Sequence, residues 1–404
     1  MGYQPKFAAK SPRKKKTSVL SVLLSVVIVP VSLYLTWKLL SGMFVTLGRP
    51  KPAAQPKTGD MAIAEQLDAF VSGRVESARN SLLSVERPQA VPEETLPPVR
   101  KVYWIDDNAQ VAPEPDQSCF GQTDNPTELQ ELLDRAAYLL DGQELYFRTD
   151  AELFQGSAVR YYLDDSIFAV TWKAVHEGSV YTFSEVKVSH PSQFRRHLAG
   201  GEFGSEMQYV TTEMAASVNA VVASSGDFYR FRDFGICVYE GKVRRVEGTY
   251  AETCYIDGNG DLHFTYGGDL LDTPSAQTYV DENDIRFSLC FGPVLVDNYE
   301  VVSHTWYGVG EINEGYARAA LCQMGPLHYI VVTANTEGPY QDIPTVATFS
   351  KYIAATGCRM AYCLDGGQTA AIVMNDELIN RPVYGQQRKI SDIIYFATAI
   401  PEGD

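Results

Sequence analysis

Twenty consecutive residues without a charge, Ser18 to Trp37, dictate how this chain can be arranged. Residues 1–17 before them hold six basic side chains and no acid, and a second apolar run ends at Leu47. About 20 apolar residues span the hydrocarbon core of a bilayer, and a basic flank stays in the cytoplasm. We therefore predict a cytoplasmic basic tail over residues 1–17, a transmembrane helix over 18–47 and an extracytoplasmic C-terminus.

A cleaved signal peptide is the alternative for this segment. The apolar run is longer than the usual core of a signal peptide, and no clear small-x-small cleavage site follows it. An uncleaved signal anchor is the better interpretation. It predicts a single-pass protein of the cell membrane.

The charge of the chain is divided unevenly between this tail and the rest. Residues 1–17 carry a net charge of +6. Because the whole chain has a net charge of −16, the remaining residues carry −22. A domain this acidic repels nucleic acid and anionic lipid. We therefore expect no nucleic-acid partner, and we expect contact with the membrane through the single helix alone.

Seven cysteines are scattered along the chain and include no CxxC pair. This spacing argues against a zinc site, and most of them are expected to be small core residues. One disulfide outside the cell remains an open alternative.

Prolines and one helical pattern mark residues 48–124 as a linker and stalk. Apolar residues recur at helical spacing between residues 58 and 85, and prolines follow that segment. The pattern predicts a stalk helix or short coiled coil, and a helix packed on the main domain is the alternative. The globular domain is predicted to cover residues 125–404.

The globular part is dominated by predicted strands with helices between them. Helices are predicted over residues 127–140, 211–220 and 345–356, and the residues from 180 to 188 alternate as in a strand. Further strands are predicted over residues 218–223, 235–240, 327–333 and 360–364. The strand 327–333 is predicted to be central and buried. The order favours an α+β or mixed α/β fold.

The acidic segment from Asp257 to Asp261 has some features of a calcium-binding loop. Leu262 stands where such a loop needs glycine, and the terminal glutamate is missing. The Asn259-Gly260 pair instead predicts a hairpin turn between strands at 255–256 and 262–266.

Three charged residues lie at predicted strand ends, where proteins often place working groups. Asp227 follows a glycine after an apolar strand, Arg318 precedes the predicted strand 327–333, and Asp365 enters the turn Gly366-Gly367. A glycine pair allows close approach of a substrate and exposes amide N–H groups to an anion. In the alternative interpretation, Asp365 caps its own turn and Arg318 forms a structural ion pair.

Several other kinds of site are absent from the sequence. It contains no HExxH, no GxSxG and no P-loop motif. The histidines lack metal-ligand spacing, and His190 and His197 stand out only because they bracket Arg195 and Arg196.

Five motifs, in order, resemble those of the phosphodiester glycosidase family, in its bacterial membrane-anchored branch. They are Ser225 to Tyr229, Phe291-Gly292-Pro293, Ala317 to Ala320, Leu364 to Ala370, and Arg388 with Asp392. The resemblance covers roughly residues 145–400.

The chain departs from the family pattern at several motif positions. Ser225 replaces asparagine, Ala317 and Ala319 replace proline and threonine, and Gln368-Thr369-Ala370 replaces Gly-Ser-Ser. The charged residues of the motifs are retained: Asp227, Arg318, Asp365 and Arg388.

The resemblance implies hydrolysis of a sugar-1-phosphodiester to a free sugar and a phosphomonoester. Asp365 is the first candidate for the base or the stabiliser of an oxocarbenium ion, Asp227 the second and Glu185 the third. Arg318 and Arg388 would bind the phosphate, because guanidinium groups match its oxygens in pairs. The backbone around them would contribute as well, through Ser225, Gly226, Gly366 and Gly367.

The predicted topology places the substrate in the cell envelope, as an exopolysaccharide or another phosphodiester-linked glycan. We assign no cofactor and no metal, and a divalent cation held by the carboxylates is left open. The alternative functions are a non-catalytic glycan-binding or envelope-assembly protein on the same fold, and a structural stalk protein.

Overall fold

The computed structural model describes residues 101–149, 158–248, 250–308 and 311–402. All of these belong to the second of two compact units, Pro98–Asp404. The predicted tail and transmembrane helix lie outside the described residues, as does the stalk helix predicted between residues 58 and 85. Among the residues that are described, no helix is long and apolar enough to cross a membrane.

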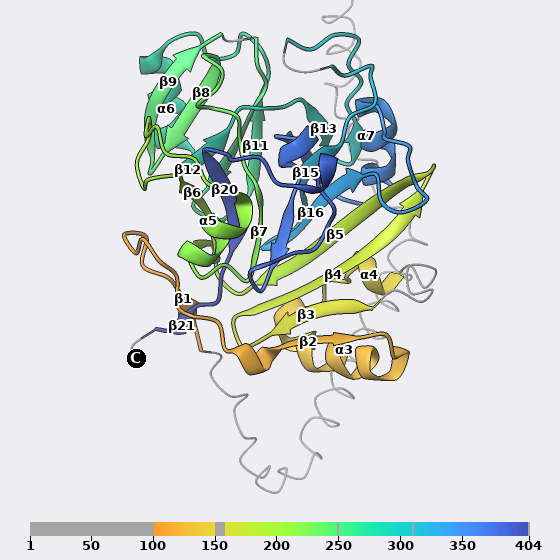
Figure 1. Ribbon diagram of the computed structural model, residues 1–404. Coiled ribbons are helices and arrows are strands. Elements are labelled where there is room, and N and C mark those ends of the chain that lie inside the picture. Colours follow the sequence, from red (N-terminus) through yellow and green to blue (C-terminus); the bar gives the residue numbers. More distant parts are fainter. Residues whose placement is uncertain (1–100, 150–157, 249, 309–310, 403–404) are drawn as a thin grey trace, which may run out of the picture. The chain divides into compact units, whose positions relative to one another are not determined.

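A nine-stranded sheet forms the centre of the unit, and every pair of its strands is antiparallel (Figure 1). In spatial order, its strands are β14 (Glu300–Val301), β13 (Val294–Asp297), β17 (Met360–Leu364), β15 (Arg318–Gly325), β16 (His328–Asn335), β5 (Ser179–Val188), β4 (Ile167–His176), β3 (Val159–Leu163) and β2 (Phe120–Thr123).

Two five-stranded antiparallel sheets lie against one face of this sheet. The first consists of β11 (Leu262–Thr265), β10 (Thr253–Asp257), β12 (Ile285–Leu289), β8 (Gly235–Tyr239) and β9 (Lys242–Glu247). The second consists of β19 (Glu377–Leu378), β18 (Ile372–Met374), β7 (Val222–Ser225), β20 (Asp392–Phe396) and β6 (Phe194–Leu198). A separate pair joins β1 (Tyr103–Trp104) to β21 (Ile400–Pro401).

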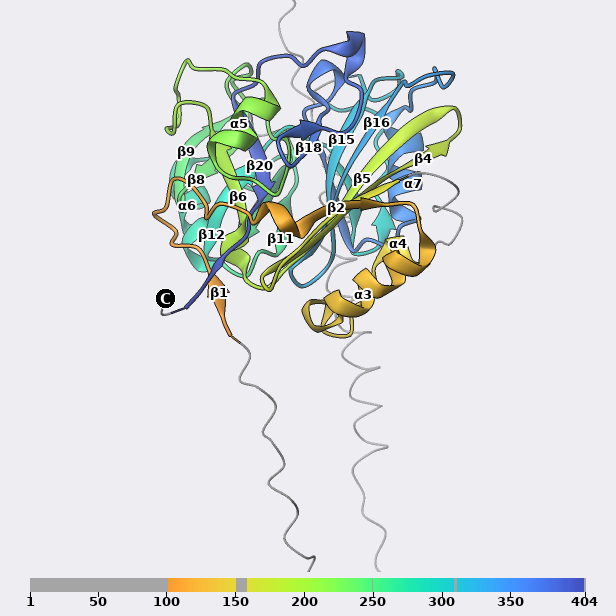
Figure 2. The same ribbon diagram turned by 60° about the horizontal axis from the view of Figure 1, so that its bottom comes forward.

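Helices cover the outer faces of these sheets (Figures 1 and 2). The α-helices of the described residues are α3 (Pro126–Leu140), α4 (Tyr146–Thr149), α5 (Thr211–Ser217), α6 (Thr273–Glu282) and α7 (Val346–Ala354). The 3₁₀ turns are η1 (Gln117–Cys119), η3 (Pro191–Gln193), η4 (Gly367–Thr369) and η5 (Val383–Gly385).

Side-chain capping fixes where the longer helices begin. The side chains of Asn125, Asp272 and Thr345 accept hydrogen bonds from the first backbone N–H groups of α3, α6 and α7. A cap of this kind satisfies a donor that the helix itself leaves unpaired.

β5 shows how the layers are held together, because both of its faces are buried. Tyr181 and Phe183 pack with the residues of α3 and α7, whereas Val186 and Val188 pack with those of the two smaller sheets. The predicted alternation of this strand is confirmed. The fold is a strand-rich α+β domain in which a central sheet separates two apolar cores.

Several predicted elements coincide with observed ones. α3 matches the predicted helix 127–140, and β16, in the middle of the nine strands, is the predicted buried strand. The hairpin turn is also confirmed, because Ile256 is the partner of Leu262 and the Asp257 side chain accepts hydrogen bonds from turn N–H groups.

Two predictions need correction. The boundary at residue 125 is too late, because β1 and β2 both belong to sheets and lie within the predicted linker 48–124. Arg318 does not lie in a loop before the strand 327–333; it begins β15, an additional strand that pairs with β16. The signal missed was a run of small apolar residues, Ala319 and Ala320, too short to show a period.

Glu185 on β5 is a structural residue rather than a member of a cleft. Its carboxylate accepts hydrogen bonds from the backbone N–H groups of Tyr146 and Phe147, at 2.9 and 3.1 Å, where α4 begins. The Nε2 atom of His328 lies 2.7 Å from the same group, and Glu185 is 1% exposed. This position explains why an acid is tolerated on a fully buried strand.

We expect Glu185→Ala to lower the free energy of unfolding by about 3 kcal/mol, because it leaves two amide donors and a histidine buried without their acceptor. Urea titration followed by circular dichroism measures this. Glu131→Ala, an exposed acid on α3, is the matched control and should change stability by less than about 0.5 kcal/mol. Equal midpoints for the two variants would contradict the assigned role.

Candidate functional site

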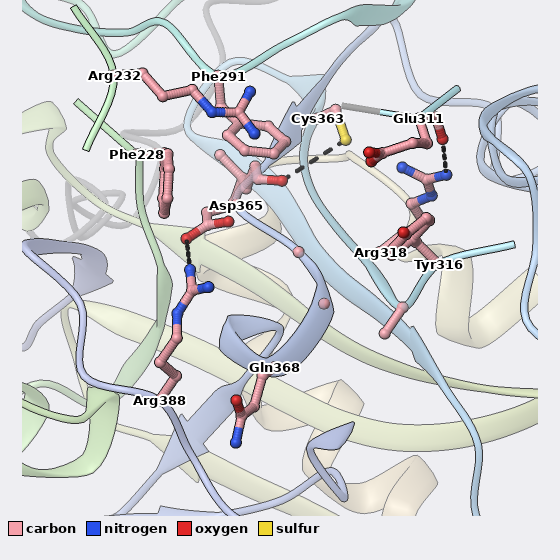
Figure 3. A pocket seen from close by; sticks show the side chains of 14 residues that line it. Phe228, Arg232, Phe291, Glu311, Tyr316, Arg318, Cys363, Asp365, Gln368 and Arg388 are labelled. Carbon is pink, nitrogen blue, oxygen red and sulfur yellow. Dashed lines mark hydrogen bonds and ion pairs between the residues drawn. The ribbon is translucent and has the colours of Figure 1, made fainter. Parts of the chain in front are cut away.

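A cavity of about 270 Å³ lies where β17 ends and β15 begins (Figure 3). Loops from distant parts of the sequence converge there. Its lining residues are Phe228, Arg232, Phe291, Glu311, Tyr316, Ala317, Arg318, Cys363, Leu364, Asp365, Gly366, Gly367, Gln368 and Arg388. Of the residues singled out in the sequence, Asp365, Arg318, Arg388, Gly366 and Gly367 are brought together.

Asp365 is held at the cavity by its backbone. Its N–H donates to the carbonyl of Gly226, and its own carbonyl accepts a 3.0 Å hydrogen bond from the Ser225 hydroxyl. Both partners come from the end of β7. Ser225 and Gly226 therefore position the candidate catalytic residue and do not themselves line the cavity.

The environment of Asp365 makes its carboxyl a weak acid. Its side chain is only 7% exposed, and this burial raises its pKa to about 7, although the Arg388 guanidinium 3.2 Å away acts in the opposite direction. Near neutral pH the group is therefore present in both protonation states. Such a carboxyl can accept or donate a proton under ordinary conditions.

Arg318 and Arg388 reach the cavity in different ways. One terminal nitrogen of Arg318 donates to the backbone carbonyls of Glu311 and Glu314, both at 2.8 Å. The Nε atom of Arg318 is buried and has no hydrogen-bond partner. Arg318 therefore holds the 311–314 loop, whereas the side chain of Arg388 is 43% exposed and pairs with Asp365.

The glycine pair after Asp365 permits a close approach between chains. A Cβ on Gly366 would lie 2.6 Å from the carbonyl oxygen of Ala317, so no larger residue fits. Gly367 adopts φ +63° and donates its N–H to the same oxygen at 2.7 Å. The amide of Gly367, predicted as an anion donor, is therefore already occupied.

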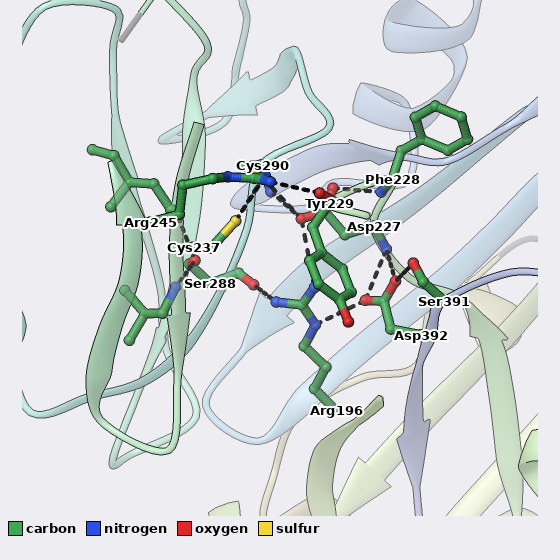
Figure 4. Close-up of polar contacts among 12 residues, drawn as sticks. Arg196, Asp227, Phe228, Tyr229, Cys237, Arg245, Ser288, Cys290, Ser391 and Asp392 are labelled. Atoms are coloured by element: carbon green, nitrogen blue, oxygen red, sulfur yellow. Dashed lines mark hydrogen bonds and ion pairs between the residues drawn. The ribbon is translucent and has the colours of Figure 1, made fainter. Parts of the chain in front are cut away.

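Asp227 belongs to a buried network of polar contacts (Figure 4) and directly precedes Phe228, which lines the cavity. One of its oxygens accepts from the N–H of Phe228 at 2.6 Å, and the other accepts from the N–H of Cys290 at 2.8 Å. Asp227 is 2% exposed and is not among the lining residues. The structure thus separates the second predicted catalytic residue from the cavity, and Glu185, the third, lies at the start of α4.

Arg196 and Asp392 complete this network. The Nε atom of Arg196 donates to Asp392 at 2.8 Å, a second nitrogen lies 3.6 Å from Asp227, and a third donates to the carbonyl of Ser288. Asp392 accepts the N–H of Asp227 as well. Burial raises the pKa of Asp392 to about 6, against the effect of Arg196. The two carboxyls also raise the pKa of Asp365.

Aromatic side chains and two further charged residues line the cavity but were not among the predicted site residues. Phe228, Phe291 and Tyr316 present rings to the space, and Arg232 lies over the first two. Glu311 is a second carboxylate on the lining. One feature of the sequence could have indicated Arg232: it lies five residues after Asp227, in the same loop after β7.

The described residues include no group of three or more histidines, cysteines, aspartates or glutamates placed to hold a metal ion. All seven cysteines lie in the described part of the chain, and each is present as a free thiol. The lining of the cavity contributes carboxyls, guanidinium groups, aromatic rings and the Cys363 thiol.

Comparisons with known proteins find one matching family and several similar structures. Residues 218–397 match the phosphodiester glycosidase family, which confirms the resemblance. The solved catalytic domain of zebrafish N-acetylglucosamine-1-phosphodiester alpha-N-acetylglucosaminidase, auto-inhibited by its pro-peptide, is 16% identical, with a TM-score of 0.46; the match covers 57% of this chain and 82% of that one. A hypothetical protein from Synechocystis is 14% identical, with a TM-score of 0.42 and coverages of 59% and 63%. A search of curated proteins finds no match.

The buried state of Asp365 makes a testable prediction about its titration. Carboxyl ¹³C NMR, assigned with Asp365→Asn, should show a midpoint near pH 7. Arg388→Gln should move the midpoint higher, because the guanidinium that favours the carboxylate is lost. A midpoint near 4 in the wild type would contradict the assigned environment.

The same shift predicts how stability depends on pH. The pKa is higher in the folded than in the unfolded chain, so the folded state binds this proton more tightly. The stability that the group contributes is complete below about pH 4, the unfolded pKa, and is lost as the pH rises through about 7. Asp365→Asn should remove this dependence, a difference of about 1.4 kcal/mol per pKa unit in urea unfolding between pH 4 and 8.

Proposed function

We propose that the domain whose residues 218–397 match the phosphodiester glycosidases hydrolyses a sugar-1-phosphodiester to a free sugar and a phosphomonoester. One observation carries the proposal: the Asp365 carboxyl, with a pKa near 7, opens onto a cavity beside guanidinium groups and aromatic rings. These are the groups that a phosphorylated sugar requires.

The aromatic residues of the lining suit the sugar. Phe228 stacks on Phe231 with ring centroids 4.6 Å apart, and Phe291 and Tyr316 supply further rings around the cavity. Rigid aromatic faces bury the apolar C–H face of a sugar at small entropic cost. The guanidinium groups of the lining suit the phosphate, whose oxygens they can bind in pairs.

The reaction itself needs one carboxylate. Water attacks the anomeric carbon, the bond from that carbon to the phosphate oxygen breaks, and the phosphate departs with the bonding electrons. Asp365 takes the proton of the attacking water as its base, or stabilises the positive charge that develops on the sugar. A phosphate leaving group needs little protonation, so the second carboxylate used by most glycosidases is not required. If a second carboxylate takes part in the reaction, Glu311 is the one that lines the cavity.

We extend the proposal to the location of the substrate. The anchor predicted over residues 18–47 would hold the domain outside the cytoplasm, where phosphodiester-linked glycans of the cell envelope, such as exopolysaccharides, occur. The net charge of −22 beyond the tail supports a substrate that is held inside a cationic cavity rather than attracted to the surface as a whole.

We expect Asp365→Asn to lower kcat by at least about 100-fold on a chromogenic sugar-1-phosphodiester, because the variant lacks the carboxylate proposed to act on the water or the sugar. Asp376→Asn, the same change at an exposed turn, should behave as the wild type. The pH profile is a second test: both roles of Asp365, as a base and as a stabiliser of positive charge, require the carboxylate, so activity should rise with pH through about 7.

Full turnover in a folded Asp365→Asn variant would contradict the proposal. Binding of a sugar-1-phosphodiester without turnover by the wild type would support the alternative, a glycan-binding or envelope-assembly protein. Thermal melting of both variants verifies that each is folded before the rates are compared.

A further inference from the structure

Three guanidinium groups line the cavity, and two of them already serve the protein. Arg388 donates to the carboxylate of Asp365. Arg318 donates twice to backbone carbonyls of the 311–314 loop. Their donors are therefore partly used in holding the site together.

Arg232 differs from both. Its guanidinium carbon lies 5.0 Å from the ring centre of Phe228 and 5.6 Å from those of Phe234 and Phe291. Within the described part of the chain, no carbonyl or carboxylate accepts a hydrogen bond from it. Figure 3 shows its side chain beside Phe291, at the edge of the cavity.

This arrangement leaves the donors of Arg232 available. A cation held over an aromatic face is fixed by the electrostatic field of the ring, not by its own N–H groups. Those N–H groups lie in the guanidinium plane, where they can bind two oxygens of one phosphate. Rings on several sides fix the orientation in advance and reduce the entropy that binding costs.

The charge of the cavity also favours an anion. Arg232, Arg318 and Arg388 line it together with two acids, Asp365 and Glu311, and burial makes Asp365 only partly charged near pH 7. The lining is therefore positive within a strongly acidic domain. A positive cavity with aromatic walls is selective for an anion that carries an apolar or sugar group.

We propose that Arg232 and Arg388 form a phosphate subsite on the ring of Phe228, with Arg232 as its principal donor. Both guanidinium carbons lie over that ring, at 5.0 and 5.3 Å from its centre. Because Arg388 pairs with Asp365, a phosphate bound to Arg388 lies next to that carboxylate, where the bond to the sugar must break. The assignment rests on the proposed function for its catalytic consequence, but phosphate binding by Arg232 can be measured without turnover.

The first experiment measures binding of inorganic phosphate and of dimethyl phosphate by calorimetry. Arg232→Gln should weaken both by about 10- to 100-fold, the loss of a charge-assisted pair of hydrogen bonds. Arg232→Lys, which keeps the charge but not the planar fork, should fall between Arg232→Gln and the wild type. Arg230→Gln is the matched control: Arg230 lies two residues away, contacts Ser205 and Glu206, and does not line the cavity.

The second experiment compares a sugar-1-phosphodiester with an aryl glycoside of the same sugar, which contains no phosphate. Arg232→Gln should raise KM by about 10-fold or more on the sugar-1-phosphodiester and by much less on the aryl glycoside, because only the first contains the phosphate. A purely structural role of Arg232 would impair both substrates equally. That result would overturn the assignment, as would wild-type affinity for phosphate in Arg232→Gln.

The two proposals fail in different ways. A wild-type protein that binds phosphate through Arg232 but cleaves no diester would retain the subsite and refute the glycosidase activity. A wild-type protein that cleaves diesters while Arg232→Gln binds phosphate normally would retain the activity and refute the subsite.

Discussion

The buried arrangement of Arg196 between Asp227 and Asp392 is the interaction on which the site depends. Arg196 comes from β6, Asp392 begins β20, and Asp227 follows β7, so three neighbouring strands meet at one guanidinium. Gly226 fits beside it because a Cβ there would lie 2.5 Å from an Asp392 oxygen. Since Gly226 receives the N–H of Asp365, the network fixes the backbone that carries the candidate catalytic residue.

If Asp227 and Asp392 are both ionised, their two negative charges exceed the single positive charge of Arg196. Burial raises the pKa of Asp392, and the remaining negative charge is felt at Asp365, whose pKa it raises in turn. Buried ion pairs of this kind add little to stability, because desolvation offsets their attraction. Here the network instead fixes the backbone that carries Asp365, and its carboxylates add to the effect of burial, which is the main cause of the raised pKa of Asp365.

The sequence predicted the elements whose signals are local. α3 shows helical spacing and a capped start, and β16 is a continuous apolar run, so both could be found without tertiary information. Asp365 could be recognised because a strand runs directly into a glycine pair. These features depend only on residues near each other in the chain.

The remaining features depend on contacts between distant segments. Glu185 resembled a cleft carboxylate until His328 and the start of α4 were seen to surround it. Asp227 carries a family motif but faces Arg196, which is on another strand. The N–H groups of Arg232 are available because its guanidinium group lies among three rings from two loops. Residue spacing along the sequence does not predict such a contact.

The pairing of β1 with β21 has a mechanical consequence. Tyr103 is the partner of Pro401, and Glu402 donates to the carbonyl of Val102, so the first and last described strands form their own two-stranded ribbon. None of its residues lines the cavity. A force applied to the backbone at residue 101 would therefore act on this two-stranded ribbon before it acts on the strands of the three larger sheets.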